Sequence, residues 1–207
     1  MASPLLMQKV TIRAPLPADL VSIHGAATPV NGALSIAAQP VHARKLQINV
    51  VVGTSTTTAI TAGVIAIDGI DQDGFTVDET ISVVANATLS PVLKSKYAYA
   101  KVNSLTLSGY AASGSGTGNT IGVGVSNDFG VPTSTNVQDL TLIKATKIIT
   151  SWNAGGPTLT FAATDDVAAN ATVDSVARTI APTTAPAALG INDYEFTYGF
   201  DTPWLYD

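Results

Sequence analysis

The chain has 207 residues and no Cys, which excludes disulfide bonds, thiolate catalysis and any zinc site with sulfur ligands. Its net charge is −5 and its ten Lys and Arg residues are scattered, so we expect no nucleic-acid partner. No apolar run reaches the ~18–20 residues of a membrane span, and the first ten residues, MASPLLMQKV, do not resemble a signal peptide, so we expect no membrane partner.

Residues 1–44 are the least regular part of the chain, with a proline every ten or so residues. Proline removes a backbone donor and restricts strand pairing to sheet edges. We therefore expect an extended N-terminal arm with short strands near 9–13 and 32–36. A strand and loops that pack on their own domain remain the alternative.

The stretch 44–52, RKLQINVVV, predicts a strand that buries Leu46, Ile48, Val50 and Val52. The stretch 57–83 then predicts a β-hairpin, because two alternating runs flank the turn residues Asp71-Gln72-Asp73-Gly74. In the first strand, Ile65, Ile67 and Gly69 are predicted to share one face. In the second strand, Phe75, Val77, Glu79, Ile81 and Val83 are predicted to share one face.

Further strands are expected along the rest of the chain, separated by loops rich in Gly, Ser and Pro, and no segment reads as a helix. Their predicted ranges are 96–110, 120–125, 137–152, 157–162, 171–180 and 192–200. About nine to eleven short strands at this spacing predict an all-β fold, a β-sandwich that can have jelly-roll-like connections. We expect the sandwich domain to span 45–207, with a weak sub-boundary near 132–136.

Catalytic chemistry is not expected. The two histidines, His24 and His42, lie in the Pro-rich N-terminal region, and no G-x-S-x-G elbow accompanies them. We interpret them as surface or interface residues. We predict that the chain is not an enzyme, and we assign no catalytic residue.

One acidic turn raises the question of a metal. Asp71-x-Asp73-Gly74 matches half of a calcium-binding loop, but the remaining ligand positions are missing. Asp and Gly are also the default residues of hairpin turns, so a plain turn is the favoured interpretation and calcium stays open. The glycines at 114–124 lack the Gly-Lys-Ser/Thr of a phosphate loop, so no cofactor is predicted.

Aromatic residues offer one competing function. Trp152, Trp204 and the tyrosines could form a platform for sugars, which would make the protein a carbohydrate- or host-receptor-binding module. Tyrosine on a sheet face is more often engaged in cross-strand packing. The two interpretations differ in whether Trp152→Ala or Trp204→Ala abolishes glycan binding.

Four segments resemble the β-rich virion proteins of tailed bacteriophages. They cover roughly 57–132 and 178–200, about half of the chain, and contain a strand ending in D-G-x-D-x-D-G, an E-T-I-x-V return strand and a Gly-rich I-G-V-G strand. The segments are ITAGVIAIDGIDQDGFTVDETISV, KSKYAYAKVNSLTLSG, TIGVGVSNDFGVP and RTIAPTTAPAALGINDYEFTY.

The resemblance implies a non-enzymatic component of the virion, assembled in the host cytoplasm. Within that class we expect a capsid decoration or cement protein that binds the head shell, with a neck, tail-tube or tail-terminator subunit as the runner-up. The expected partners are the major capsid protein or other virion proteins, and copies of the same chain in a homo-oligomer. The N-terminal arm and the loop 111–119 are the expected contact regions.

Composition points in the same direction. Charged residues make up only 12% of the chain, about half the usual share, and hydrophobic residues make up 46%. A protein with so little charge either buries surface against neighbours or covers it with Thr, Ser, Asn and Gly. Both alternatives fit a structural subunit better than a freely diffusing enzyme.

Overall fold

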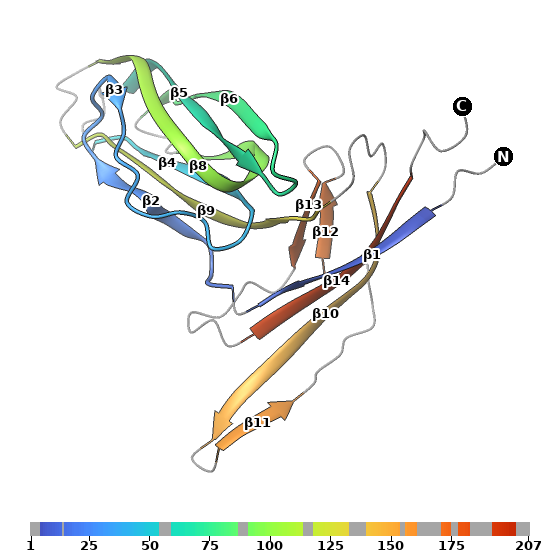
Figure 1. The fold of residues 1–207 in the computed structure, drawn as a ribbon. Helices are drawn as coiled ribbons and strands as arrows, with labels where there is room; N and C mark the ends of the chain where they lie inside the picture. Colours follow the sequence, from blue (N-terminus) through green and yellow to red (C-terminus); the bar gives the residue numbers. More distant parts are fainter. Residues whose placement is uncertain are drawn as a thin grey trace, which may run out of the picture. The chain divides into compact units, whose positions relative to one another are not determined.

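The computed structural model describes residues 5–13, 15–53, 59–86, 91–113, 118–132, 140–153, 156–160, 171–174, 178–182 and 192–201. Throughout these ranges the regular structure is β-strand and no helix occurs, which confirms the predicted all-β class (Figure 1). The strands are β1 (Leu5–Ile12), β2 (Asp19–Ala27), β3 (Gly32–Ala33), β4 (Arg44–Val51), β5 (Ala59–Asp71), β6 (Thr76–Ser82), β7 (Ala85–Asn86), β8 (Val92–Ser113), β9 (Thr120–Gly130), β10 (Leu140–Asn153), β11 (Gly156–Thr160), β12 (Ala171–Asp174), β13 (Thr179–Pro182) and β14 (Asn192–Asp201).

The chain forms two compact units. One consists of 1–18 together with 127–207, and the other of 19–126. This division differs from the arm at 1–44 and the sandwich at 45–207 that the sequence suggests, and those boundaries stay predictions. Within the former arm region, β2 is a strand that the sequence did not indicate, and it belongs to the 19–126 unit.

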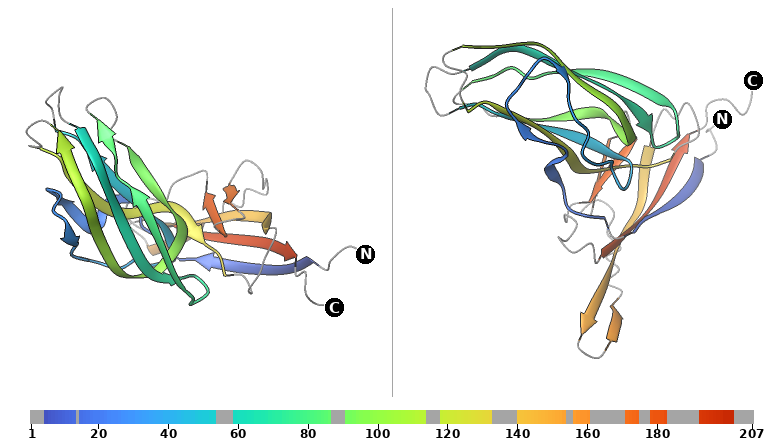
Figure 2. Two further views of the ribbon diagram at one scale, coloured as in Figure 1. Left: turned by 90° about the horizontal axis from the view of Figure 1, so that it is seen from above. Right: turned by 60° about the vertical axis from the view of Figure 1, so that its left-hand side comes forward.

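The 19–126 unit is a β-sandwich of antiparallel strands. One layer contains β6, β5 and the second half of β8, and the other contains the first half of β8, β4 and β9 (Figures 1 and 2). β8 belongs to both layers because it pairs with β4 up to Tyr99 and with β5 from Tyr99 onwards. The β-sandwich predicted from strand spacing is therefore the architecture of this unit.

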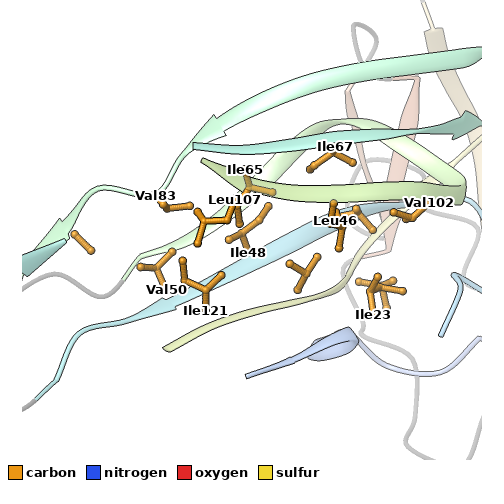
Figure 3. Packing of buried hydrophobic residues seen from close by; sticks show 14 of the residues in the cluster. Ile23, Leu46, Ile48, Val50, Ile65, Ile67, Val83, Val102, Leu107 and Ile121 are labelled. Atoms are coloured by element: carbon orange, nitrogen blue, oxygen red, sulfur yellow. The ribbon is translucent and has the colours of Figure 1, made fainter. Parts of the chain in front are cut away.

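The core of this unit lies between the layers, where aliphatic side chains from both sides meet (Figure 3). Burial follows the predicted alternation: Ile65 and Ile67 are buried on one face of β5, while Ala66 between them is partly exposed. The predicted set on β4 is also buried. Each aliphatic side chain removed from water contributes about 1.5–3 kcal/mol, so this pattern specifies the strand faces.

A register shift in β8 is stabilised by one serine. The pairing with β4 shifts between Lys45 and Gln47, and Ser95 lies buried at the shift. Its hydroxyl accepts the Leu46 N–H at 2.8 Å and donates to the Tyr97 carbonyl at 2.7 Å. The side chain thus replaces the backbone partner that the irregular ladder removes.

Glycine allows β2 to cross β9 closely. A Cβ at Gly124 would lie 1.7 Å from the Asp19 carbonyl oxygen, and a Cβ at Gly122 would lie 2.8 Å from Val21 Cγ1. No side chain fits at either position. The two glycines therefore allow the backbones of β2 and β9 to approach closely where the strands pair.

The other unit is built on a four-stranded sheet in the order β1-β14-β10-β11. β1 pairs with β14 in one unbroken register from Leu5 to Ile12, and Lys9 forms an ion pair of 2.7 Å with Glu195. Its core contains one aromatic face of β14 and residues from β1, β9, β12 and β13. The buried residues are Ile12, Phe129, Val131, Ala171, Ile180, Tyr194, Phe196 and Tyr198.

Candidate functional site

The acidic turn between β5 and β6 is organised by Asp71. Its Oδ1 accepts the N–H groups of Asp73 and Phe75, both at 2.9 Å. The Gly74 N–H reaches the Asp71 carbonyl at 3.2 Å, the Asp71 N–H reaches the Phe75 carbonyl at 2.9 Å, and Gly74 has a φ of 87°. This is a type I turn closed by a left-handed glycine, with Asp at the first position and Gly at the fourth.

In this turn, the Asp71 carboxylate binds backbone N–H groups of the turn itself. Asp71 is buried, and its Oδ1 is occupied by two backbone donors. Among the residues that the structure describes, no group of three His, Asp or Glu side chains is arranged to hold a metal ion. The two hydrogen bonds to Asp71 Oδ1 are those of a plain hairpin turn, the favoured interpretation of the Asp71 and Asp73 spacing.

The most elaborate polar contact lies next to this turn and was not anticipated. Tyr99 on β8 donates its hydroxyl hydrogen to Glu79 Oε1 at 2.9 Å, and the Lys96 N–H donates to Glu79 Oε2 at 2.8 Å. β6 and β8 are separated by β5 in the sheet, so a single carboxylate joins two strands that form no backbone ladder with each other. Both carboxylate oxygens of Glu79 are engaged.

Gly69 makes room for this contact. A Cβ at position 69 would lie 2.3 Å from the Lys101 carbonyl oxygen and 2.5 Å from Tyr99 Cδ1. The Tyr99 ring therefore occupies the space above Gly69, where another residue would place its side chain. The sequence indicated that Gly69 shares a strand face with Ile65 and Ile67, but not which ring covers it.

The surroundings of the Tyr99 phenol, including the Glu79 carboxylate, disfavour its ionisation. Burial raises the pKa of the Tyr99 phenol far above its ordinary value, and the charge and hydrogen bond of Glu79 raise it further. The phenol consequently stays protonated and acts as a donor. A nucleophile or general base needs the opposite shift, toward working pH, so the arrangement favours a structural role.

The two histidines are placed differently. His24 is buried on β2, and its Nδ1 lies 2.9 Å from the Ser35 carbonyl oxygen and 3.3 Å from Ser35 Oγ. The shorter contact requires a proton on Nδ1, so this nitrogen cannot accept the hydroxyl hydrogen of Ser35. His42 is partly buried in the segment between β3 and β4. His24 is therefore not the surface residue that one interpretation expected, and a place at an interface stays a prediction for both histidines.

The two tryptophans and the expected contact loop 111–119 lie partly outside the described residues. Trp152 belongs to β10, opposite Pro157 of β11, and its side chain is among those not described. Trp204 and residues 114–117 of the expected contact loop lie outside the described ranges. Of that loop, Asn119 is buried, where it donates to Tyr110 Oη at 3.0 Å and accepts the Gly53 N–H at 2.9 Å.

Comparisons with known proteins gave no match to a protein-family model, to a curated protein or to a solved structure. Across the described ranges, no helix has the length and apolar character needed to cross a membrane.

Proposed function

We propose that the chain is a non-enzymatic structural protein of a tailed-phage virion. Its leading role would be that of a capsid decoration or cement protein that binds and stabilises the head shell. The observation that carries the proposal is the order of motifs at 57–132. In the fold, β5, β6, β7, β8 and the first part of β9 lie within the 19–126 unit, so most of this stretch belongs to one structural unit, whereas 127–132 and 178–200 belong to the other.

The use of polar groups supports a structural role. Glu79, Tyr99 and His24 each make contacts that stabilise strands or loops. Gln47 likewise donates from its buried amide to the Val125 carbonyl at 2.8 Å. Polar side chains whose hydrogen bonds are made within the fold contribute to stability, which supports a structural role over a catalytic one.

The outer face of β5 and β6 also suits a protein that contacts others over a broad area. Its exposed positions on β6 are short and polar: Thr76, Asp78, Thr80 and Ser82. Long charged side chains, which lose much entropy when a partner immobilises them, are absent from β6 apart from Glu79. Such a surface can be covered at low entropic cost.

Particle association tests the proposal. Phage particles produced with the wild-type gene and with the gene deleted would be banded on density gradients and examined by mass spectrometry. We expect the chain in wild-type particles, and we expect shells without it to release DNA at lower temperature. Absence of the chain from purified particles would overturn the virion role.

A second measurement separates head from tail. Electron microscopy of particles labelled through a tag on the chain would place the label on the shell surface if the protein is a decoration protein. Label at the neck or along the tail, together with rings of six or more copies in solution, would establish the runner-up instead. Glycan binding without any particle association would favour the receptor-binding alternative.

A further inference from the structure

The charges of the 19–126 unit are segregated by strand. The hairpin formed by β5, its turn and β6 contains Asp and Glu but no Lys or Arg, whereas β8 contains Lys but no Asp or Glu. The hairpin carboxylates are Asp68, Asp71, Asp73, Asp78 and Glu79, and the β8 lysines are Lys94, Lys96 and Lys101. Opposite charges therefore belong to different strands of one sandwich.

Two of these strands present open edges. Among the described strands, β6 pairs with β5 and ends the sheet, and residues 92–98 of β8 pair with β4 alone. The two edges lie side by side, because Glu79 of β6 accepts the Lys96 N–H. One side of the sandwich thus carries an acidic edge in one layer and a basic edge in the other.

The two edges are also aligned along their length. Val83 and Val50 lie at the same end of the core (Figure 3), and the Val50 N–H donates to the Pro91 carbonyl at 3.1 Å. Val84 and Val92 therefore mark the same end of the two edges, and they are 51% and 46% exposed. Each edge has an exposed valine at one end and an exposed charge further along.

Each edge carries one exposed charge that bears on association: Asp78 on β6 and Lys96 on β8. Considering the described part of the chain, the exposed carboxylate of Asp78 and the ammonium of Lys96 form no ion pair, and Lys96 Nζ lies 5.0 Å from the centroid of the Tyr97 ring. Charges on a strand edge usually prevent copies from associating, because like charges repel. Two neighbouring edges that carry opposite charges instead favour association between copies, because each edge attracts the other edge of a second copy.

We infer that these two edges form an interface between two copies of the chain. The copies are related by a two-fold axis that runs along the strands, between the two layers. This axis places β6 of one copy beside residues 92–98 of the other and keeps every residue at its own level. Asp78 then faces Lys96 of the second copy, and Val84 faces Val92, twice in each dimer.

The charge pattern selects this axis. A two-fold axis perpendicular to the layers would bring β6 against β6 and Asp78 near its own equivalent, which is repulsive. The pairing along the strands satisfies both charges in both copies. Association between copies does not require the virion role, so its failure and the failure of that role are separate results.

Charge reversal tests the interface in the full-length protein. Sedimentation equilibrium at low ionic strength would compare wild type, Asp78→Lys, Lys96→Glu and an equimolar mixture of the two variants. We expect wild type to dimerise and each variant alone to dimerise at least about tenfold more weakly. The mixture should recover the dimer, because both contacts become attractive again in the heterodimer.

Lys101→Glu is the matched control, since Lys101 is an exposed β8 lysine that lies opposite Ile70 of β5 and not on the open edge. It should dimerise as wild type does, and equal melting temperatures would show that all variants fold. High salt should weaken the wild-type dimer. A wild-type monomer at millimolar concentration, or a mixture that associates no better than the separate variants, would overturn the inference.

Discussion

Tyr99 and Glu79 are joined by a 2.9 Å hydrogen bond although their strands, β8 and β6, are not neighbours in the sheet. The bond links the two layers of the sandwich on the side where β6 and residues 92–98 of β8 form the sheet edges. Its removal should therefore affect the stability of the 19–126 unit. Tyr99→Phe keeps the ring above Gly69 and deletes the hydroxyl alone. We expect a loss of about 1–2 kcal/mol in the free energy of unfolding, measured by urea denaturation. Tyr97→Phe is the matched control, because Tyr97 is a partly exposed tyrosine of the same strand.

The same residue should make stability fall at alkaline pH. The pKa of Tyr99 is raised in the folded protein above its ordinary value of 10.0, so the unfolded chain loses this proton first. The contribution of Tyr99 is fully present below pH 10 and decreases as the pH rises beyond it, by at most about 1.4 kcal/mol per pH unit. Denaturation between pH 9 and 11 should show a shallower decline for Tyr99→Phe than for wild type. Parallel declines would contradict the prediction.

Gly69 should not tolerate a side chain. In Gly69→Ala the new Cβ would clash with the Lys101 carbonyl and the Tyr99 ring, and backbone cannot move away as a flexible side chain could. We expect destabilisation of about 3 kcal/mol or insoluble protein. Gly25→Ala is the control, because no atom lies within 4 Å of the position its Cβ would take. Equal melting temperatures for the two variants would show that the ring does not occupy this space.

Ser95→Ala should leave a buried donor without a partner. The Leu46 N–H would lose its acceptor at the register shift, at a cost of about 1–3 kcal/mol. Ser104→Ala, at an exposed position of the same strand, should change the free energy of unfolding by less than about 0.5 kcal/mol. Thermal unfolding followed by circular dichroism can rank the two. A larger effect at Ser104 would contradict the role assigned to Ser95.

The hydrogen bonds of Asp71 predict how substitutions at this position and added calcium affect stability. Because Asp71 caps backbone N–H groups through Oδ1, Asp71→Asn should be tolerated better than Asp71→Ala, which removes both hydrogen bonds. We expect a difference of about 1 kcal/mol or more between these variants. Millimolar calcium should leave the melting temperature of wild type unchanged. A rise that Asp71→Ala abolishes would instead establish a cation site.

Much of the fold could be predicted from alternation. The faces of β4, β5 and β14 follow directly from apolar residues at every second position, since one face of each is buried. β2 escaped prediction because His24 and the glycine and alanines around it do not alternate, and because flanking prolines suggested an arm. The stretch 171–180 also divides: β12 ends at Asp174, and β13 begins at Thr179 and continues to Pro182.

The polar contacts were less accessible from the sequence. Glu79 shares a face with apolar residues of β6, which was visible, but its partners Tyr99 and Lys96 become neighbours only when β8 turns from one layer into the other. Long-range contacts of this kind leave no periodic signal. The absence of Lys and Arg between 46 and 93 was visible, and it is the signal from which the acidic edge could have been inferred.

The participation of β8 in both layers has a consequence for hydrogen exchange. A 22-residue strand that pairs first with β4 and then with β5 ties the opening of one layer to the opening of the other. Amide protons at the centres of β4, β5 and β8 should therefore exchange through one common opening event, with equal protection and equal sensitivity to denaturant. The sandwich would behave as a single cooperative folding unit, with no layer able to act as an independent hinge or latch.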